Sequence, residues 1–173
     1  MGSRLLVLAL MTMIVSSCNS AHNKPVIQQV PGKSEMADLN RYLVRKDRER
    51  IESYIERKNL KMNETPSGLW YYIISEGTGK YLTDKDKVKM EYECSLLDGT
   101  PCYSSGELGP KEIVLGKTSL ESGLDQGLRM LKPGGEALFI LPPFMAYGLP
   151  GDGKKIPSRA VIVYNVRISA GQQ

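Results

Sequence analysis

The first clear periodic pattern of apolar positions lies in residues 35–60. Apolar side chains recur there at helical spacing, at Met36, Leu39, Leu43, Ile51, Tyr54 and Ile55. This spacing predicts an amphipathic helix, with a gap at Asp47 where the helix could divide into two. We interpret the mixed charge run 45–50 as a solvated face. The apolar face then packs on its own domain or, alternatively, pairs with a second copy to form a homodimer.

After residue 65 the pattern changes to short strands separated by turns. Alternating, β-branched and aromatic segments predict strands at 69–74, 88–94, 102–103, 113–115, 137–141 and 160–168. The segment 120–131 has leucines at helical spacing and ends at a Pro-Gly-Gly sequence, which predicts one short helix. Pro and Gly are frequent between 142 and 159, which indicates a loop. The pattern predicts an α+β domain in which an antiparallel sheet wraps on a short helix.

Residues 1–17 have the features of a signal peptide. Arg4 precedes an apolar run, 5–15, that is too short to span a bilayer as a folded helix. Two serines and Cys18 follow, an arrangement that resembles the lipobox of bacterial lipoproteins, in which the cysteine is acylated. We expect cleavage before Cys18 and a lipid anchor on it. The alternative is a plain secretory signal that ends in a cysteine. The mature chain then consists of a flexible tether (18–34), a helical extension (35–64) and a folded domain (65–173).

Composition narrows the chemistry available to this domain. The chain has 173 residues, a formal net charge of +4, one histidine and three cysteines. So few His and Cys residues exclude most zinc sites, His-based triads and haem ligation. No phosphate-binding glycine motif is present. We expect no metal or cofactor, and no nucleic-acid partner, because the basic residues are spread along the chain.

Several short motifs follow one another between residues 67 and 168. They are Glu76-Gly77-Thr78-Gly79, Leu97-Asp98-Gly99, Val114-Leu115-Gly116, Leu131-Lys132-Pro133-Gly134-Gly135 and Ala146-Tyr147-Gly148. In this order and spacing they resemble FKBP-type peptidyl-prolyl cis-trans isomerases. The helix followed by residues 67–71 is similar to the short lipoprotein members from Bacteroidota, some of them linked to gliding motility. The resemblance implies an FKBP-like half-barrel of antiparallel strands wrapped on a short helix.

The resemblance also implies a function and a location. The implied partners are proline-containing polypeptides, and the implied role is to assist the folding of exported proteins. The lipid anchor would hold the chain in the cell envelope, facing the periplasm. Asn19 is not the aspartate that retains lipoproteins in the inner membrane, so we expect the outer membrane.

Rotation about an Xaa-Pro bond needs no nucleophile. The twisted amide is less polar than the planar amide, so an apolar pocket with one hydrogen-bond donor favours it. The resemblance implies Tyr147 and Tyr92 as catalytic residues, with the Tyr147 hydroxyl as the donor. As substrate-binding residues it implies Cys102, Tyr103, Ile113, Leu120, Glu121, Leu124, Ile156 and Tyr164. For Tyr92 and Tyr164 the alternative role is strand core, and Glu121 would donate its backbone N–H.

Four positions depart from the family pattern. Cys102-Tyr103 stands where Phe-Asp is usual, Leu124 replaces a frequent Trp, and Glu121 places a charge where an aliphatic side chain is usual. We therefore expect weak or selective isomerase activity, unless Tyr103 swings in to replace the missing aromatic ring. The alternative function is a catalytically silent binding module that acts as a chaperone or adaptor.

Cys94 and Cys102 lie symmetrically about Asp98 in the predicted hairpin. In a regular hairpin they would face each other directly, close to disulfide range. An exported protein is in an oxidising compartment, which permits the bond. A Cys94–Cys102 disulfide and two free buried thiols both remain open at this point.

Overall fold

The computed structural model describes residues 32–170. The predicted signal peptide, the predicted acylation site Cys18 and most of the predicted tether lie outside these residues. Within the described part of the chain, no helix combines the length and the apolar character that a membrane span requires.

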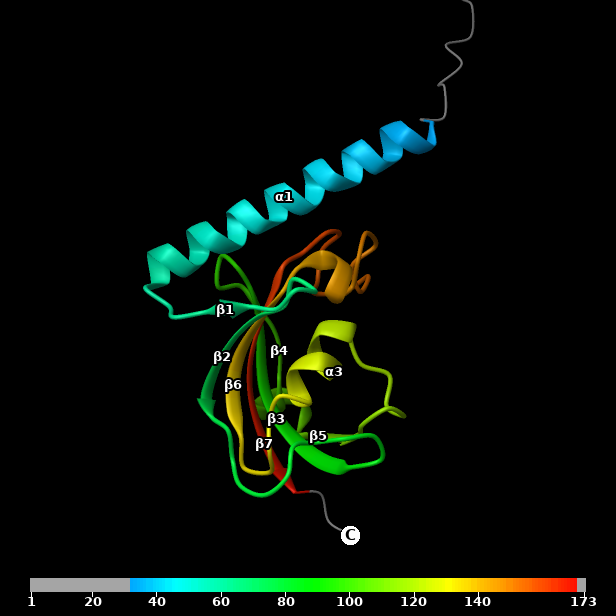
Figure 1. Cartoon of the computed structure of the whole chain (residues 1–173). Coiled ribbons are helices and arrows are strands. Elements are labelled where there is room, and N and C mark those ends of the chain that lie inside the picture. Colours follow the sequence, from blue (N-terminus) through cyan, green and yellow to red (C-terminus); the bar gives the residue numbers. More distant parts are fainter. Residues whose placement is uncertain (1–31, 171–173) are drawn as a thin grey trace, which may run out of the picture. The chain divides into compact units, whose positions relative to one another are not determined.

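The N-terminal helix α1 (Lys33–Lys58) is continuous, without a break at Asp47 (Figure 1). It ends where Asn59 adopts the left-handed conformation, with φ 49°, as is common at the C-terminal end of helices. The predicted extension 35–64 is therefore wrong at its C-terminal end. There the chain forms β1 (Asn63–Glu64), the first strand of the sheet.

The sheet confirms the predicted α+β class and FKBP-like half-barrel. Its further strands are β2 (Trp70–Ser75), β3 (Lys87–Leu96), β4 (Pro101–Ser104), β5 (Lys111–Val114), β6 (Glu136–Leu141) and β7 (Ile162–Ala170). All pairs are antiparallel, in the order β1-β2-β6-β7-β3-β4, and β5 also pairs with β3. The short helices are α2 (Ser105–Leu108), α3 (Ser122–Leu128) and the 3-10 turn η1 (Pro143–Met145).

Strand β6 is buried on both faces. One face joins the main core with residues of α3, in a cluster that includes Ala137, Phe139, Leu141, Leu124 and Leu128. The other face contributes Ile140 and Leu138 to a second cluster around Ile51 of α1. The sheet therefore separates two apolar layers, with α3 on one side and the C-terminal half of α1 on the other. For its C-terminal half, this packing confirms the interpretation of α1 as a helix that packs on its own domain.

Helix α3 lies against the sheet (Figure 1) because two glycines face it. A Cβ atom on Gly127 would come within 2.8 Å of the Phe139 ring, and one on Gly123 within 2.7 Å of Leu141. Real Cβ atoms do not approach other atoms so closely. Glycine at both positions is therefore what allows this close approach of helix and sheet.

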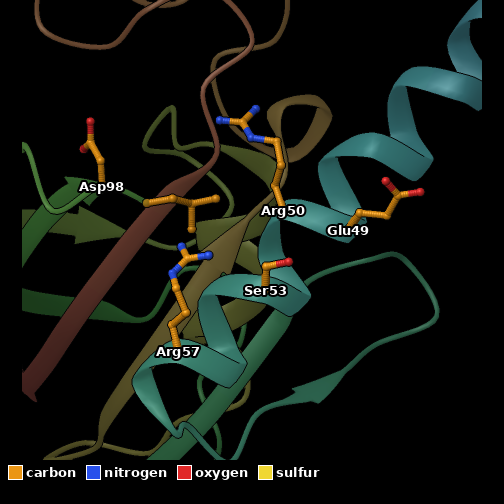
Figure 2. A pocket seen from close by; sticks show the side chains of 6 residues that line it. Glu49, Arg50, Ser53, Arg57 and Asp98 are labelled. Atoms are coloured by element: carbon orange, nitrogen blue, oxygen red, sulfur yellow. The ribbon is translucent and has the colours of Figure 1, made fainter.

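A polar hollow of about 480 Å³ lies along α1 (Figure 2). Its lining comes from α1 and from the turn after β3: Glu49, Arg50, Ser53, Arg57, Leu97 and Asp98. None of the predicted site residues lines it. An apolar groove of about 280 Å³ lies further along α1, where Met36 and Leu39 face Phe144 and Leu149. These four side chains are about half exposed or more, and pairing of α1 with a second copy would use this part of the helix.

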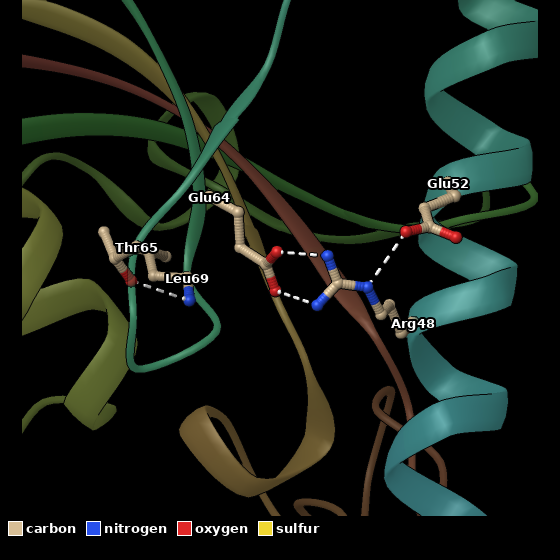
Figure 3. A network of polar contacts seen from close by, with 5 residues as sticks. All are labelled: Arg48, Glu52, Glu64, Thr65 and Leu69. Atoms are coloured by element: carbon tan, nitrogen blue, oxygen red, sulfur yellow. Dashed lines mark hydrogen bonds and ion pairs between the residues drawn. The ribbon is translucent and has the colours of Figure 1, made fainter.

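Two consecutive charged residues attach α1 to the domain. Arg48 forms a bidentate ion pair with Glu64 of β1 and also contacts Glu52, and Figure 3 shows these contacts. Asp47 is only 4% exposed and accepts a hydrogen bond of 2.6 Å from Arg159, in the loop before β7. The interpretation of 45–50 as a solvated face is therefore wrong at Asp47, which is buried against a partner far along the sequence, whereas Arg48 remains about half exposed.

The Asp47–Arg159 pair leads to a prediction about stability. Replacement of Asp47 by Asn leaves the Arg159 guanidinium without a carboxylate in a largely buried position. We expect the free energy of unfolding to fall by about 2–3 kcal/mol, near the lower end for broken buried pairs because Arg159 is partly exposed. Urea unfolding followed by circular dichroism measures this loss. The control is Asp38→Asn, which removes an exposed ion pair with Arg41 on the same helix and should cost less than about 0.5 kcal/mol. Equal stability of the two variants would contradict the assigned role of Asp47.

Candidate active site

The structure brings the predicted site residues together on the α3 side of the sheet. Those that are buried in the main core are Cys102, Ile113, Leu124, Ile156 and Tyr164. Those that are partly buried and pack against it are Tyr92, Tyr103, Leu120 and Tyr147. Glu121 joins them through a hydrogen bond to Tyr164. The strands β3, β4, β5 and β7, helix α3 and the loop between β6 and β7 all contribute.

Three tyrosines form the polar part of this site, and we call Tyr92, Tyr147 and Tyr164 the tyrosine cluster. The rings of Tyr92 and Tyr164 lie 6.3 Å apart between centroids, at 56° to each other. These two residues come from neighbouring strands, β3 and β7. Tyr147 follows η1, in the loop between β6 and β7. Only 4% of Tyr164 is exposed. This burial fits the alternative role of Tyr164 as part of the strand core.

Glu121 places a carboxylate beside the tyrosine cluster. It is the N-cap residue of α3, and its Oε1 atom accepts a hydrogen bond of 3.2 Å from the Tyr164 hydroxyl. The other carboxylate oxygen, Oε2, is buried and has no hydrogen-bond partner among the described residues. No Lys or Arg of the described residues forms an ion pair with Glu121. The carboxylate is therefore only half satisfied.

The surroundings keep the tyrosine hydroxyls protonated. Burial raises the pKa of Tyr147, and the neighbouring Glu121 carboxylate raises it further. Burial also raises the pKa of Tyr164, again with a contribution from Glu121. For Tyr92 the same two influences raise the pKa, together with Cys94. At neutral pH all three side chains are phenols, so each can donate a hydrogen bond.

Tyr103 is held by the loop that precedes β7. Its hydroxyl donates a hydrogen bond to Asp152, and the Lys155 ammonium lies 5.4 Å from the centre of its ring. Asp152 also accepts hydrogen bonds of 2.8 Å from the backbone N–H groups of Lys154 and Ile156. Burial alone would raise the pKa of Asp152, but these hydrogen bonds outweigh it and lower that pKa. Tyr103 thus fixes the loop that carries Tyr147 and Ile156.

Asp152 was not among the residues predicted from the sequence. The signal was present, because an Asp between two glycines in a Pro-rich loop is typical of a turn closed by the side chain. What the sequence could not supply was the partner, Tyr103, which lies 49 positions earlier.

Cys94 and Cys102 are both buried and free. They do not face each other directly, because the pairing of β3 with β4 contains an irregularity. Cys94 pairs with Tyr103 while Ser95 pairs with Pro101, which leaves Cys102 as the extra residue of a bulge. The direct opposition expected for a regular hairpin is therefore wrong. Both side chains still belong to the main core.

The described residues contain no group of three or more His, Cys, Asp or Glu side chains placed to hold a metal ion. The arrangement at the site is instead an apolar surface with phenolic donors and one carboxylate. Such a surface can bind an uncharged or cationic segment of polypeptide and donate hydrogen bonds to its carbonyl groups.

Comparison with known proteins identifies related chains. Residues 79–169 match the family model for FKBP-type peptidyl-prolyl cis-trans isomerase. A Neisseria meningitidis protein named probable FKBP-type peptidyl-prolyl cis-trans isomerase FkpA is 34% identical over 124 residues, which cover 70% of this chain and 45% of that protein. A Haemophilus influenzae protein of similar name is 34% identical over 112 residues, 64% of this chain and 46% of that protein. The chain thus spans about half the length of the curated relatives it matches.

Solved structures agree with this result. The crystal structure of FkpA from Escherichia coli has a TM-score of 0.63 and 26% identity, and the match covers 79% of this chain and 63% of that one. The structure of AtFKBP13 has a TM-score of 0.59 and 26% identity, covering 65% of this chain and 99% of the other.

The burial of Cys94 predicts how its reactivity depends on pH. Burial raises the pKa of this thiol from 9.0 to about 12, and a hydrogen bond with Tyr164 offsets only part of the effect. The reactive thiolate is therefore scarce in the native chain at pH 8. We expect iodoacetamide to alkylate Cys94 at least about 100-fold more slowly in the native chain than in the denatured one. The rate at which Cys94 is alkylated in the native chain should still be rising above pH 10, where the rate in the denatured chain has levelled off.

Mass spectrometry of the Cys94 peptide at each pH measures these rates, and the denatured chain is the control. Rapid alkylation of Cys94 in the native chain would contradict the burial of this thiol. An intact mass lower by two hydrogens before reduction would show that the two thiols are bridged.

Proposed function

The chain belongs to the FKBP-type peptidyl-prolyl cis-trans isomerase family, and we propose that it acts as one, catalysing rotation about Xaa-Pro bonds in polypeptides. The observation that carries the proposal is the tyrosine cluster. Its protonated hydroxyls lie beside the buried side chains of Leu124 and Ile156, on the surface where the family resemblance places the substrate.

The reaction has to overcome a barrier of about 18–20 kcal/mol, which comes from the resonance of the planar amide. Resonance is lost at the twisted geometry, so the carbonyl becomes less polar there. An apolar surface accepts the twisted amide more readily than the planar one, and this difference lowers the barrier. The partly buried side chains of Tyr92, Leu120 and Tyr147 supply that surface. Leu124, Ile113 and Ile156 are almost completely buried and belong to the main core against which these side chains pack.

A hydrogen-bond donor orients the substrate on this surface. Tyr147 fits the role because its pKa is raised and its hydroxyl keeps its proton over the physiological range. It lies in a loop that is tied to the domain through Asp152 and Arg159. The donor is therefore held in place before the substrate arrives, which reduces the entropy lost on binding.

One observation favours a second function, a binding module without catalysis. At the positions where the family usually has Phe-Asp, this chain has Cys102-Tyr103, and the Tyr103 ring and hydroxyl are engaged by Lys155 and Asp152. Both contacts hold Tyr103 against the loop that precedes β7. A chain with this altered surface could bind proline-containing segments as a chaperone or adaptor without accelerating their isomerisation.

We further propose that the chain is a lipoprotein of the cell envelope, similar to the short family members of Bacteroidota, facing the periplasm from the outer membrane. Support comes from Arg4, the apolar run 5–15 and Cys18. Expression in a bacterial host with radiolabelled palmitate should label the wild-type chain and leave Cys18→Ala unlabelled. Equal labelling of the two chains, or none of either, would contradict the anchor.

Tyr147 provides the direct test of the isomerase. Replacement by Phe keeps the ring and removes the hydroxyl, so a hydrogen bond of about 1 kcal/mol is lost and kcat/KM should fall about 5-fold. The rates are measured on a panel of Xaa-Pro peptides. Tyr72→Phe is the matched control, because Tyr72 lies in β2, where it is 40% exposed, and is not one of the predicted site residues.

A wild-type rate above the uncatalysed one, lowered by Tyr147→Phe alone, would support the enzyme and locate its site. If the folded chain accelerates no peptide, the binding module becomes the better assignment. Equal effects of both substitutions would remove Tyr147 from the mechanism.

A further inference from the structure

Glu121 is an unusual residue for the surface on which an amide is to be twisted. A carboxylate is strongly hydrated in water and costs free energy to bury unless its oxygens find partners. At Glu121 one oxygen has such a partner, the Tyr164 hydroxyl at 3.2 Å. The other is buried and has none among the described residues. The two donors beside this carboxylate, the hydroxyls of Tyr164 and Tyr147, are both uncharged, so the site has a carboxylate without a cationic partner among the described residues.

The neighbouring bases do not supply the missing partner. Lys155, in the loop beside the site, pairs with Glu107 at 3.3 Å and lies over the Tyr103 ring. Arg129, beyond the end of α3, pairs with Asp125 and Asp84. Both cations are already engaged by other carboxylates, so Glu121 contributes an uncompensated negative charge to the site.

A cationic group of the ligand would complete this arrangement. An ammonium or guanidinium group forms charge-assisted hydrogen bonds with a carboxylate that are stronger than neutral ones. The tyrosine rings beside Glu121 add a second attraction, because the face of an aromatic ring favours a cation. Tyr92 and Tyr164 are 6.3 Å apart between ring centroids, and Glu121 bonds directly to the second of them. A carboxylate bordered by aromatic rings is thus suited to a cationic side chain.

We propose that Glu121 is a specificity-determining residue that makes this chain prefer prolines flanked by Lys or Arg. The inference rests on the proposed binding of proline-containing polypeptides at this site and adds the charge of the preferred substrate. A flanking acidic residue is disfavoured, because it would bring a second negative charge to the same place. A flanking Leu is accepted, but without the gain in binding that the contact between a cation and Glu121 provides.

The experiment compares matched peptides on matched variants. Two series of capped peptides place Lys, acetyl-lysine, Leu or Glu directly before or directly after one proline. Acetyl-lysine keeps most of the shape of Lys and removes its charge. Isomerisation is followed by NMR exchange, since a coupling protease would itself respond to the charge of the peptide. The variants are Glu121→Gln, which keeps an acceptor for Tyr164, and Glu112→Gln, which removes a carboxylate from an exposed position of strand β5.

In at least one series, the wild-type chain should isomerise the Lys peptide with a kcat/KM about 10-fold above that of the acetyl-lysine peptide. Glu121→Gln should reduce this ratio to about 1, because the amide of Gln carries no charge to attract the Lys ammonium. Glu112→Gln should keep the full ratio. The gain should appear mainly in KM, because the charge contact is made in the planar and the twisted amide alike.

Two results would overturn the proposal. One is a wild-type ratio near 1 in both series. The other is a Glu121→Gln variant that slows all peptides equally, since this would make Glu121 a residue that merely positions Tyr164.

If no peptide is isomerised at all, the proposed isomerase function fails separately. The NMR titrations then still decide the role of Glu121, because the Lys peptide must bind about 10-fold more tightly than the acetyl-lysine peptide for the proposal to hold.

Discussion

The close approach of α3 to β6 determines where the site residues lie. It is possible only because Gly123 and Gly127 present no side chain to Leu141 and the Phe139 ring. With the helix seated at this depth, its N-cap residue Glu121 reaches Tyr164 on β7, and Leu124 enters the main core. A larger residue at either glycine would push the helix away from the sheet. The apolar surface and the carboxylate would then separate from the tyrosine cluster.

The loop between β6 and β7 connects this site to the rest of the chain. It carries Tyr147 and Ile156 toward the site, while Asp152 accepts a hydrogen bond from Tyr103 of β4. Near its end, Arg159 bonds to Asp47 of α1. The loop is thus fixed from two directions by polar contacts. The N-terminal helix, which contributes none of the predicted site residues, nevertheless helps to hold the segment that carries the proposed donor.

Much of the fold follows from local sequence patterns. The alternation in 88–94 and the leucine spacing in 120–131 gave a strand and a helix close to β3 and α3. The family resemblance then brought residues from four strands, one helix and the loop between β6 and β7 into one site, and the structure places them in or against the main core. These patterns could not predict contacts between residues that lie far apart in the sequence, or contacts that depend on the register of paired strands. Asp47 and Arg159 lie 112 positions apart, and the bulge at Cys102 shifts a pairing that a regular hairpin would have kept.

The long separation between Asp47 and Arg159 also has a consequence for biosynthesis. Ribosomes add about 5–20 residues per second, so Arg159 is made some seconds, on the order of 6–20, after Asp47. Over this interval α1 has neither its buried ion pair nor the β6 and β7 side chains that cover Ile51. Helix α1 is therefore the first element of the domain to be synthesised, but its contacts with the rest of the domain are among the last to form. A nascent chain of this protein presents an uncovered apolar helix face until its final strand has been translated.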